Sequence, residues 1–434
     1  MMEKQTKIGT VCNDFDTFQL KSVLVKNDAG DWGSEPDDHA IGVIRSTNFN
    51  NDGKLDLSDI AHRTLSEKKF KEKKLFANDI LIERSGGSET QPVGRVGFVT
   101  EEMAKTNYAF ANFIQRISLN DEINPKFVYF CLQQMYEMGV TAGMQSQTTG
   151  IRNLDWKQYV KVSLPKPSPN EQTAIAHILS KVDEVIASVQ SSIAAAERLK
   201  KSLMQNLLTG RMKPDGTLRK EDEFYMDEKF GKVPMGWEVK AVGDKSVCHI
   251  NPNYKYKKKE LYDFVPMEAV RENFGGLAFV EKQVIDNGSY TRFKAGDILF
   301  AKITPCSENG KVAYIEHIDS EVGFASTEFI VFQPTDNVNG RFVYLLLASE
   351  NVHRLAISLM EGTTGRQRIP WKIFRNRIFV PMPEKDEQTE IVNRLVLFDK
   401  QITDKKLKIA TLERLKKSLM QNLLTGRVWV KHIN

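Results

Sequence analysis

The residues of this chain that could act on a substrate do not form a complete catalytic motif. Asn251-Pro252-Asn253-Tyr254 comes nearest to the Asn/Asp-Pro-Pro-aromatic loop that holds a flipped adenine in a methyltransferase, but it lacks the second proline. Gly310-Lys311 lacks the upstream glycine of a nucleotide-binding loop. Pro36-Asp37-Asp38 lacks the continuation of a nuclease site, and the seven histidines show no HxxxH spacing. These absences favour a non-catalytic binding protein with no cofactor and no metal.

Four loops carry side chains that suit contacts with DNA. Lys and Arg contact phosphates, Gln can pair with N6 and N7 of adenine, and Arg can pair with O6 and N7 of guanine. The alternative for each side chain is an ordinary solvated loop position. The candidates in the first half are Arg84, Ser85, Ser88, Arg95, Gln145, Gln147, Thr148 and Arg152. Those in the second half are Lys302, Thr304, Asn309, Lys311, Thr363, Arg366, Gln367 and Arg368.

Two lysine clusters admit either a solvated surface or phosphate contacts. One comprises Lys68, Lys69, Lys71, Lys73 and Lys74, and the other lies at 255–259. The second is interleaved with Tyr254 and Tyr256, which favours phosphate contacts there and adds Lys257 and Lys258 to the candidates.

These loops belong to a chain that repeats itself. The sequence ERLKKSLMQNLLTGR occurs at 197–211 and again at 413–427. The match extends forward, because Thr148-Thr149-Gly150 answers Thr363-Thr364-Gly365 and Asp79-Ile80-Leu81 answers Asp297-Ile298-Leu299. The period is too long for a solenoid and indicates two copies of a whole domain with its helix. Such an object suits a partner that is nearly two-fold symmetric, and duplex DNA is the leading candidate.

Each half ends in a predicted helix of about 38 residues, which is roughly 57 Å long. Asn170 and Asp386 are the expected N-caps, and Gly210 and Gly426 the expected C′ residues. Apolar residues recur at spacings of four and three, which predicts a coiled coil of the two helices, antiparallel because a domain precedes each. The alternative is that each helix packs only on its own domain. The stripes are Ile175, Leu179, Val182, Ile186, Val189, Ile193, Ala196, Leu203 and Leu207, then Ile391, Leu395, Phe398, Ile402, Lys405, Ile409, Leu412, Leu419 and Leu423.

The identity of the repeated block includes polar residues, which suggests two copies of one docking surface. Recent duplication or recombination between the halves is the competing explanation. The candidate docking residues are Lys200, Lys201, Gln205, Asn206, Lys416, Lys417, Gln421 and Asn422.

The composition is that of an ordinary protein of the cytosol. Of 434 residues, 27% are charged and 41% hydrophobic, and the net charge of +5 permits nucleic-acid binding without requiring it. No apolar run approaches a membrane span or a signal peptide. The four cysteines stand singly, so we expect reduced thiols and a cytoplasmic location.

The ordered motifs resemble the specificity subunit (HsdS) of type I restriction-modification systems over nearly the whole chain. They are the proline-to-helix entries with Glu-Gln (165–172 and 381–388), the Thr-Thr-Gly…Trp segments ending at Trp156 and Trp371, Gly236-Trp237-Glu238, and the duplicated helical ending. The first half departs from the pattern because it has no Gly-Trp opening, although Ser22-Val23-Leu24 answers Ser246-Val247-Cys248.

The resemblance implies an α+β protein with two mixed α/β target-recognition domains separated by two long antiparallel helices. The expected parts are recognition domain 1 (1–168), helical region 1 (169–212), recognition domain 2 (213–384, with a linker at 213–233) and helical region 2 (385–434). It also implies that each domain reads half of a split, asymmetric double-stranded DNA site. Two modification (methyltransferase) subunits would dock on the chain, and restriction (motor-nuclease) subunits would join through them. A structural coiled-coil scaffold and a degenerate methyltransferase are the alternatives.

Overall fold

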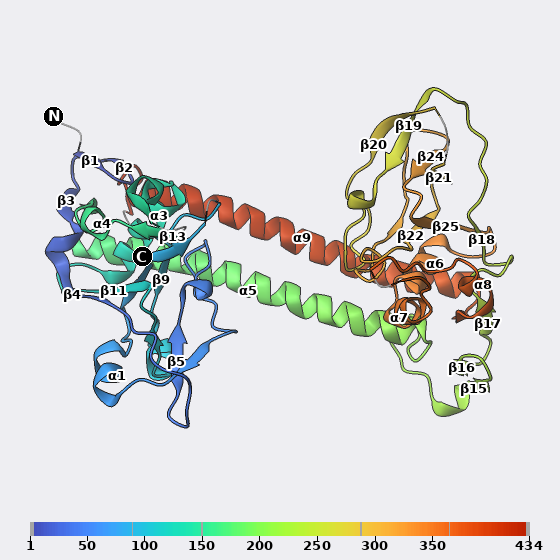
Figure 1. Ribbon diagram of the computed structural model, residues 1–434, viewed down its shortest axis with the longest axis horizontal. Coiled ribbons are helices and arrows are strands. Elements are labelled where there is room, and N and C mark those ends of the chain that lie inside the picture. Colours follow the sequence, from blue (N-terminus) through green and yellow to red (C-terminus); the bar gives the residue numbers. More distant parts are fainter. Residues whose placement is uncertain (1–3, 89, 149–150, 287–288, 364, 431–434) are drawn as a thin grey trace. The chain divides into compact units, whose positions relative to one another are not determined.

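The computed structural model describes residues 4–88, 90–148, 151–286, 289–363 and 365–430. The chain forms two compact units. Unit 1 comprises Met1–Gln190 and Leu407–Asn434, and unit 2 comprises Ser191–Lys406. Helices α5 (Pro169–Leu208) and α9 (Lys385–Leu423) each begin in one unit and end in the other (Figure 1). Each unit therefore contains one front domain, the start of its own helix and the end of the other helix.

The front domain of unit 1 is built around an antiparallel sheet in the order β4-β11-β7-β9. A second sheet, β10-β5-β6, contains one parallel pair, and a third has the order β12-β13-β8. The strands are β1 (Lys4–Thr6), β2 (Gly9–Val11), β3 (Asp16–Gln19), β4 (Leu24–Ala29), β5 (Ile41–Ile44), β6 (Ala61–Arg63), β7 (Ile80–Glu83), β8 (Ser85–Gly87), β9 (Val96–Phe98), β10 (Ala109–Phe110), β11 (Ile114–Leu119), β12 (Gln145–Thr148), β13 (Ile151–Leu154) and β14 (Ser163–Lys166). The helices before α5 are α1 (Glu67–Lys73), α2 (Glu101–Lys105), α3 (Pro125–Glu137) and α4 (Trp156–Tyr159).

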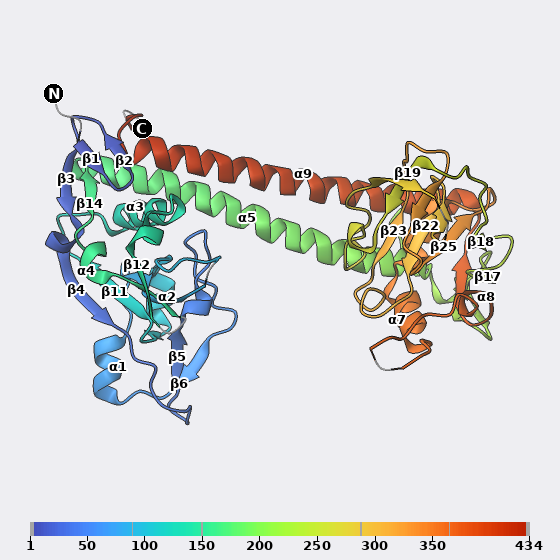
Figure 2. The ribbon, with the colours of Figure 1, turned by 45° about the horizontal axis from the view of Figure 1, so that its top comes forward.

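The front domain of unit 2 repeats this plan. Its main sheet has the order β18-β25-β22-β23 (Figure 2). A second sheet, β20-β19-β24-β21, again contains one parallel pair. The strands are β15 (Phe224–Asp227), β16 (Gly231–Pro234), β17 (Glu238–Ala241), β18 (Cys248–Ile250), β19 (Glu260–Val265), β20 (Glu281–Ile285), β21 (Thr291–Phe293), β22 (Ile298–Ala301), β23 (Val312–Tyr314), β24 (Gly323–Ala325), β25 (Phe329–Pro334) and β26 (Phe379–Met382). The helices are α6 (Gly340–Leu347), α7 (Glu350–Ser358) and α8 (Ile373–Asn376). The predicted repeat of one mixed α/β domain is confirmed.

The apolar residues of the repeated block belong to the core of each unit. In unit 1, Met420 and Leu423 of α9 and Leu424 directly after it join the core formed by the main sheet, α3 and the start of α5. In unit 2, Leu203, Leu207 and Leu208 of α5 join the equivalent core. The end of one helix thus completes the core of the domain that precedes the other.

Both predicted apolar stripes are buried or half-buried along their whole length. In each unit the two helical segments are also joined by an equivalent ion pair. Lys416 contacts Asp183 at 2.7 Å in unit 1, and Lys200 contacts Asp399 at 2.5 Å in unit 2. In unit 2, Lys405 fills the one polar stripe position and donates to Ser192 Oγ at 2.7 Å. The helices therefore contact each other as well as the domains, and they run antiparallel.

The predicted N-caps are wrong by two residues. The helices begin at Pro169 and Lys385, so Asn170 and Asp386 lie inside the first turn. Ser168 caps α5, because its hydroxyl accepts from the Glu171 amide at 3.4 Å. Pro suits the first helical position, where its missing N–H would have no partner.

The Glu-Gln motif ties each helix to its front domain. The side-chain oxygen of Gln172 accepts from the Asn124 amide at 2.8 Å, and Gln388 accepts from Asn339 at the same distance. Both glutamines are almost fully buried. Asn124 and Asn339 cap α3 and α6, so one buried glutamine in each half holds two helix starts together.

The predicted C′ glycines are confirmed. Gly210 and Gly426 have φ values of 68° and 70°, in the left-handed region. A Cβ atom would lie 2.2 Å from Pro234 Cγ at Gly210 and 2.4 Å from Cys12 Sγ at Gly426. Conformation and packing therefore both require glycine at these two positions.

The start of the first domain has a structural counterpart in the second half. The hairpins β1-β2 and β15-β16 each precede a strand that pairs with the end of the domain, β3 with β14 and β17 with β26. Phe15 directly precedes β3 and Trp237 directly precedes β17, and both are buried. Phe15 therefore occupies the place of the tryptophan that the first half lacks.

Candidate nucleic-acid interface

The two candidate loops of each half lie together in the structure. In unit 1 the Leu154 amide donates to the Arg84 carbonyl at 2.8 Å, and β8 pairs with β13. In unit 2 the Ile369 amide donates to the Lys302 carbonyl at the same distance. The same main-chain bond thus joins two loops that are far apart in sequence. We call each joined pair of loops a cleft.

In unit 1 several candidate side chains are accessible at the cleft. Arg84 and Gln145 are half-buried, with Arg84 Nη1 3.4 Å from Gln115 Oε1. Arg152 is half-buried and has no side-chain partner among the described residues. Ser88 is exposed and bonds only within its own loop. The side chains of Gln147 and Thr148, like Thr149, Gly150 and Thr364, lie outside the described part of the chain.

Two candidates of unit 1 are internal, contrary to the sequence prediction. Arg95 is 8% exposed and forms two hydrogen bonds with the fully buried Glu83, at 2.7 and 2.8 Å. It also donates to the carbonyls of Ser46 and Phe49. The buried Ser85 hydroxyl bonds Asn153 at 2.6 Å. Both side chains hold the cleft together from inside.

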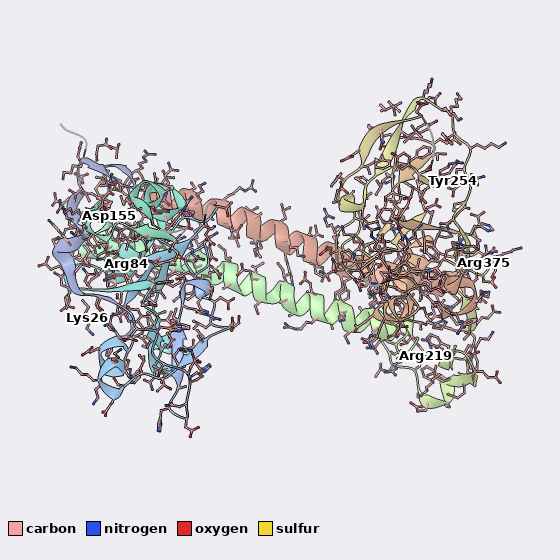
Figure 3. The ribbon with its side chains drawn as sticks, in the orientation of Figure 1. Lys26, Arg84, Asp155, Arg219, Tyr254 and Arg375 are labelled. Atoms are coloured by element: carbon pink, nitrogen blue, oxygen red, sulfur yellow. The ribbon has the colours of Figure 1, made fainter. Side chains whose placement is uncertain are left out.

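A third loop, which was not among the sequence candidates, forms the floor of the cleft. The Phe113 carbonyl accepts from the amides of Arg84 and Ser85 at 2.8 and 3.2 Å. Asn112 and Phe113 line a hollow of about 500 Å³ together with residues of both candidate loops. The remaining lining residues are Arg84, Ser85, Ser146, Asn153, Leu154, Asp155, Trp156 and Lys157. Arg84 and Asp155, which line the hollow from the two different loops, are labelled in Figure 3. Asn112-Phe113 and Thr327-Glu328 occupy the same position in the two halves of the repeat, and this correspondence could have indicated the loop.

In unit 2 the first candidate loop makes mostly internal bonds. Lys302 Nζ donates to the Thr327 carbonyl at 2.6 Å, and Lys311 Nζ donates to the Met267 carbonyl at 3.1 Å. Asn309 is exposed and donates to Glu272 at 2.8 Å. The hydroxyl of Thr304 is buried and has no partner among the described residues.

The second candidate loop of unit 2 is more open. Thr363 and Arg366 are exposed, and the half-buried Gln367 accepts from the Thr304 amide at 3.1 Å through its carbonyl. Arg368 bonds Glu328 through Nε and Nη2 at 3.0 and 2.9 Å. The hydrogen bond with Arg368 lowers the pKa of the Glu328 carboxyl. This pair orients the guanidinium while its Nη1 side stays available.

The two lysine clusters differ in their bonding. Lys69, Lys71 and Lys73 of unit 1 pair with carboxylates at 2.6 to 2.8 Å, on Asp31, Glu67 and Asp28 respectively. In unit 2, Lys258 has no carboxylate partner among the described residues. The ion pair of Lys257 with Glu260 is long, at 3.8 Å. The unit 2 cluster is therefore the more available for phosphate contacts.

Two tyrosines hold the unit 2 lysine cluster in place. The hydroxyl of Tyr254 donates to Asp297 at 2.9 Å, and Arg292 lies 4.5 Å from the centre of the Tyr256 ring. Burial raises the pKa of Asp297 to about 6. The tyrosines alternate with the exposed Lys255 and Lys257, so one side of the segment is fixed and the other faces solvent.

Comparisons with known proteins place the chain in a family. Residues 13–198 and 234–414 match the family model described as the type I restriction modification DNA specificity domain. The chain belongs to this family. The two matches begin at the equivalent starts of the two halves, just before Phe15 and Trp237.

Curated specificity subunits are similar to all or part of the chain. It is 25% identical over 369 residues to the type I restriction enzyme MjaVIII specificity subunit of Methanocaldococcus jannaschii, covering 82% of this chain and 80% of that one. It is 34% identical over 176 residues to the EcoAI specificity subunit of Escherichia coli, covering 40% and 29%. A solved type I restriction-modification S subunit from M. genitalium has a TM-score of 0.53 at 16% identity, covering 97% and 99%. That likeness supports the fold.

In this member of the family, several polar residues of the repeated block bond within the chain. Lys200 and Lys416 form the equivalent ion pairs with Asp399 and Asp183, so both side chains already have a partner within the chain. The Thr209 and Thr425 hydroxyls bond carbonyls one turn earlier. The docking candidates that remain at the surface are Lys201, Gln205, Lys417 and Gln421, with Asn206 and Asn422 half-buried.

The described residues of this family member show no group of three His, Cys, Asp or Glu side chains placed to hold a metal ion. No described helix is long and apolar enough to cross a membrane. Cys131 and Cys248 are buried, and burial raises the pKa of the Cys248 thiol to about 12. These two thiols act as core side chains.

Proposed function

We propose that this chain is the DNA sequence-specificity subunit of a type I restriction-modification complex. Each unit reads one half of a split, asymmetric duplex site through its cleft. The chain itself is non-catalytic and supplies the choice of sequence to modification and restriction subunits.

One observation carries this proposal. The two clefts have the same main-chain construction but different side chains, because Arg84 and Lys302 carry the same bond to their second loops. Two clefts with the same main-chain structure can approach duplex DNA in the same way, and their different side chains can then recognise two different base sequences. A structural scaffold would have no use for such variation.

The exposed part of the repeated block is the proposed docking surface for two modification subunits. Each copy presents an equivalent Lys and Gln one helical turn apart, Lys201 with Gln205 and Lys417 with Gln421. Lys201 forms one exposed ion pair, with Glu350 at 3.0 Å, which a partner can displace at little cost. Restriction subunits would join through the modification subunits.

A genome-wide map of adenine methylation in the source strain, with and without this gene, tests the proposal. We expect methylation to disappear at one split, asymmetric motif when the gene is removed. An unchanged map, combined with recovery of the modification subunit bound to this chain, would contradict the specificity role.

A further inference from the structure

The floor of the cleft has the same main chain in both units but unlike side chains. The Arg84 amide donates to the Phe113 carbonyl at 2.8 Å, and the Lys302 amide donates to the Glu328 carbonyl at 2.9 Å. Phe113 and Glu328 are therefore equivalent, as are Asn112 and Thr327. Positions that have the same main-chain structure in both units but different side chains can give the two units different ligand specificities.

In unit 1 the floor presents side chains that the fold itself does not use. The side chain of Phe113 is 43% exposed, and the side-chain amide of Asn112 has no partner among the described residues. Their main chain is nevertheless firmly held, because the Phe113 carbonyl accepts two amides and the Ala111 amide donates to the Ile44 carbonyl at 2.8 Å. A rigid turn that exposes an aromatic ring and a free amide is arranged for a ligand.

The chemistry of these two side chains selects one kind of base pair. An Asn amide can bond N6 and N7 of adenine together, and a Phe ring can contact the methyl group of thymine in the major groove. We infer that Asn112 and Phe113 are specificity-determining residues that recognise an adenine and a thymine, on one base pair or on adjacent ones, in the half-site read by unit 1. This inference rests on the proposed function.

The rest of the hollow fits this role. Trp156 is fixed, because its Nε1 donates to Asn27 at 3.0 Å and its ring stacks on Tyr159 with centroids 5.3 Å apart. Arg84 and the exposed Lys157 place cations on the lining, suited to flanking phosphates. The hollow thus combines an apolar surface, which suits the thymine methyl group, with positive charges, which suit the phosphates of the DNA backbone.

Unit 2 cannot make the same choice. Glu328 is engaged by Arg368, and the Thr327 carbonyl accepts from Lys302. No aromatic ring or free amide stands at these positions. The half-site of unit 2 is therefore expected to lack this particular discrimination.

Base analogues test the inference on the chain bound to its modification subunit. The target motif comes from the methylation map. In a set of duplexes, one thymine of the unit 1 half-site at a time is replaced by uracil, or one adenine at a time by 7-deazaadenine. We expect one uracil to weaken binding about fourfold, as for one buried methyl group. We expect one 7-deazaadenine to weaken it at least about fivefold.

Variants assign these effects to residues. Phe113→Ala should bind the thymine and uracil duplexes equally, and Asn112→Ala should lose the 7-deazaadenine effect. Phe76→Ala is the matched control, because Phe76 is 47% exposed in the same unit but lies outside the hollow, and it should keep both effects. Specific binding that ignores every analogue, or effects that persist in the variants, would overturn the inference. A lack of any sequence-specific binding would instead overturn the proposed function.

Discussion

Removing Arg95 should destabilise unit 1 locally and strongly. Arg95→Ala leaves the Glu83 carboxylate, which is 0% exposed, without its two hydrogen bonds at 2.7 and 2.8 Å. Breaking a buried ion pair by removing one partner costs about 3–5 kcal/mol. Hydrogen exchange at the amides of β7, which ends at Glu83, and of β9, which directly follows Arg95, measures this loss as faster exchange. DNA binding should fall for every sequence alike, since the whole cleft loosens.

Unit 2 supplies the control for this experiment. At the equivalent positions it has Ala301 and Lys311, and Lys311 donates to the Met267 carbonyl at 3.1 Å. The double variant Glu83→Ala/Arg95→Lys copies that solution and should recover at least half of the lost protection, together with DNA binding. If Arg95→Ala left exchange unchanged but abolished sequence preference, Arg95 would be a DNA contact and its assignment to the interior would be wrong.

Three further predictions concern charge, pH and assembly. Replacing Lys257–Lys259 by Ala should weaken binding to all DNA alike and reduce the salt slope by up to about 3, one for each phosphate contact; a changed sequence preference in competition assays would contradict this. The raised pKa of Asp297 means that the folded state holds the proton more tightly than the unfolded state, so stability falls as pH rises from about 4 to about 6. Asp297→Asn should remove most of this loss, about 3 kcal/mol, in urea titrations at pH 7, whereas a variant that is no more stable there would count against a buried, titrating carboxyl. Alanine at the exposed docking candidates should abolish recovery of the modification subunit in pull-downs without altering thermal unfolding, whereas unchanged recovery would move the docking surface elsewhere; these residues are Lys201, Gln205, Lys417 and Gln421.

The repeat and the helices could be predicted because their signals are local and periodic. The apolar stripes needed only spacing, and Gly210 and Gly426 needed only the rule for helix ends. The N-caps were misplaced because Asn170 and Asp386 are good capping residues by type, whereas α5 starts at Pro169 and its cap is Ser168, two residues before the predicted one.

The roles of single polar residues could not be predicted in the same way. Arg95 looks like a surface cation in sequence, and only the fold brings Glu83 against it across neighbouring strands. Lys200 and Lys416 gave no sign that each would meet an aspartate on the other helix. Asn112 and Phe113 were missed because nothing in their own segment shows that it underlies two distant loops.

The proposed function requires that each unit reads one half-site independently of the other. This can be measured by exchanging residues 1 to 165 for those of a relative with a known, different motif and then mapping adenine methylation. We expect one half of the split motif to change to the relative's sequence while the other half stays the same. Methylation at a motif in which both halves change, or neither does, would contradict the claim.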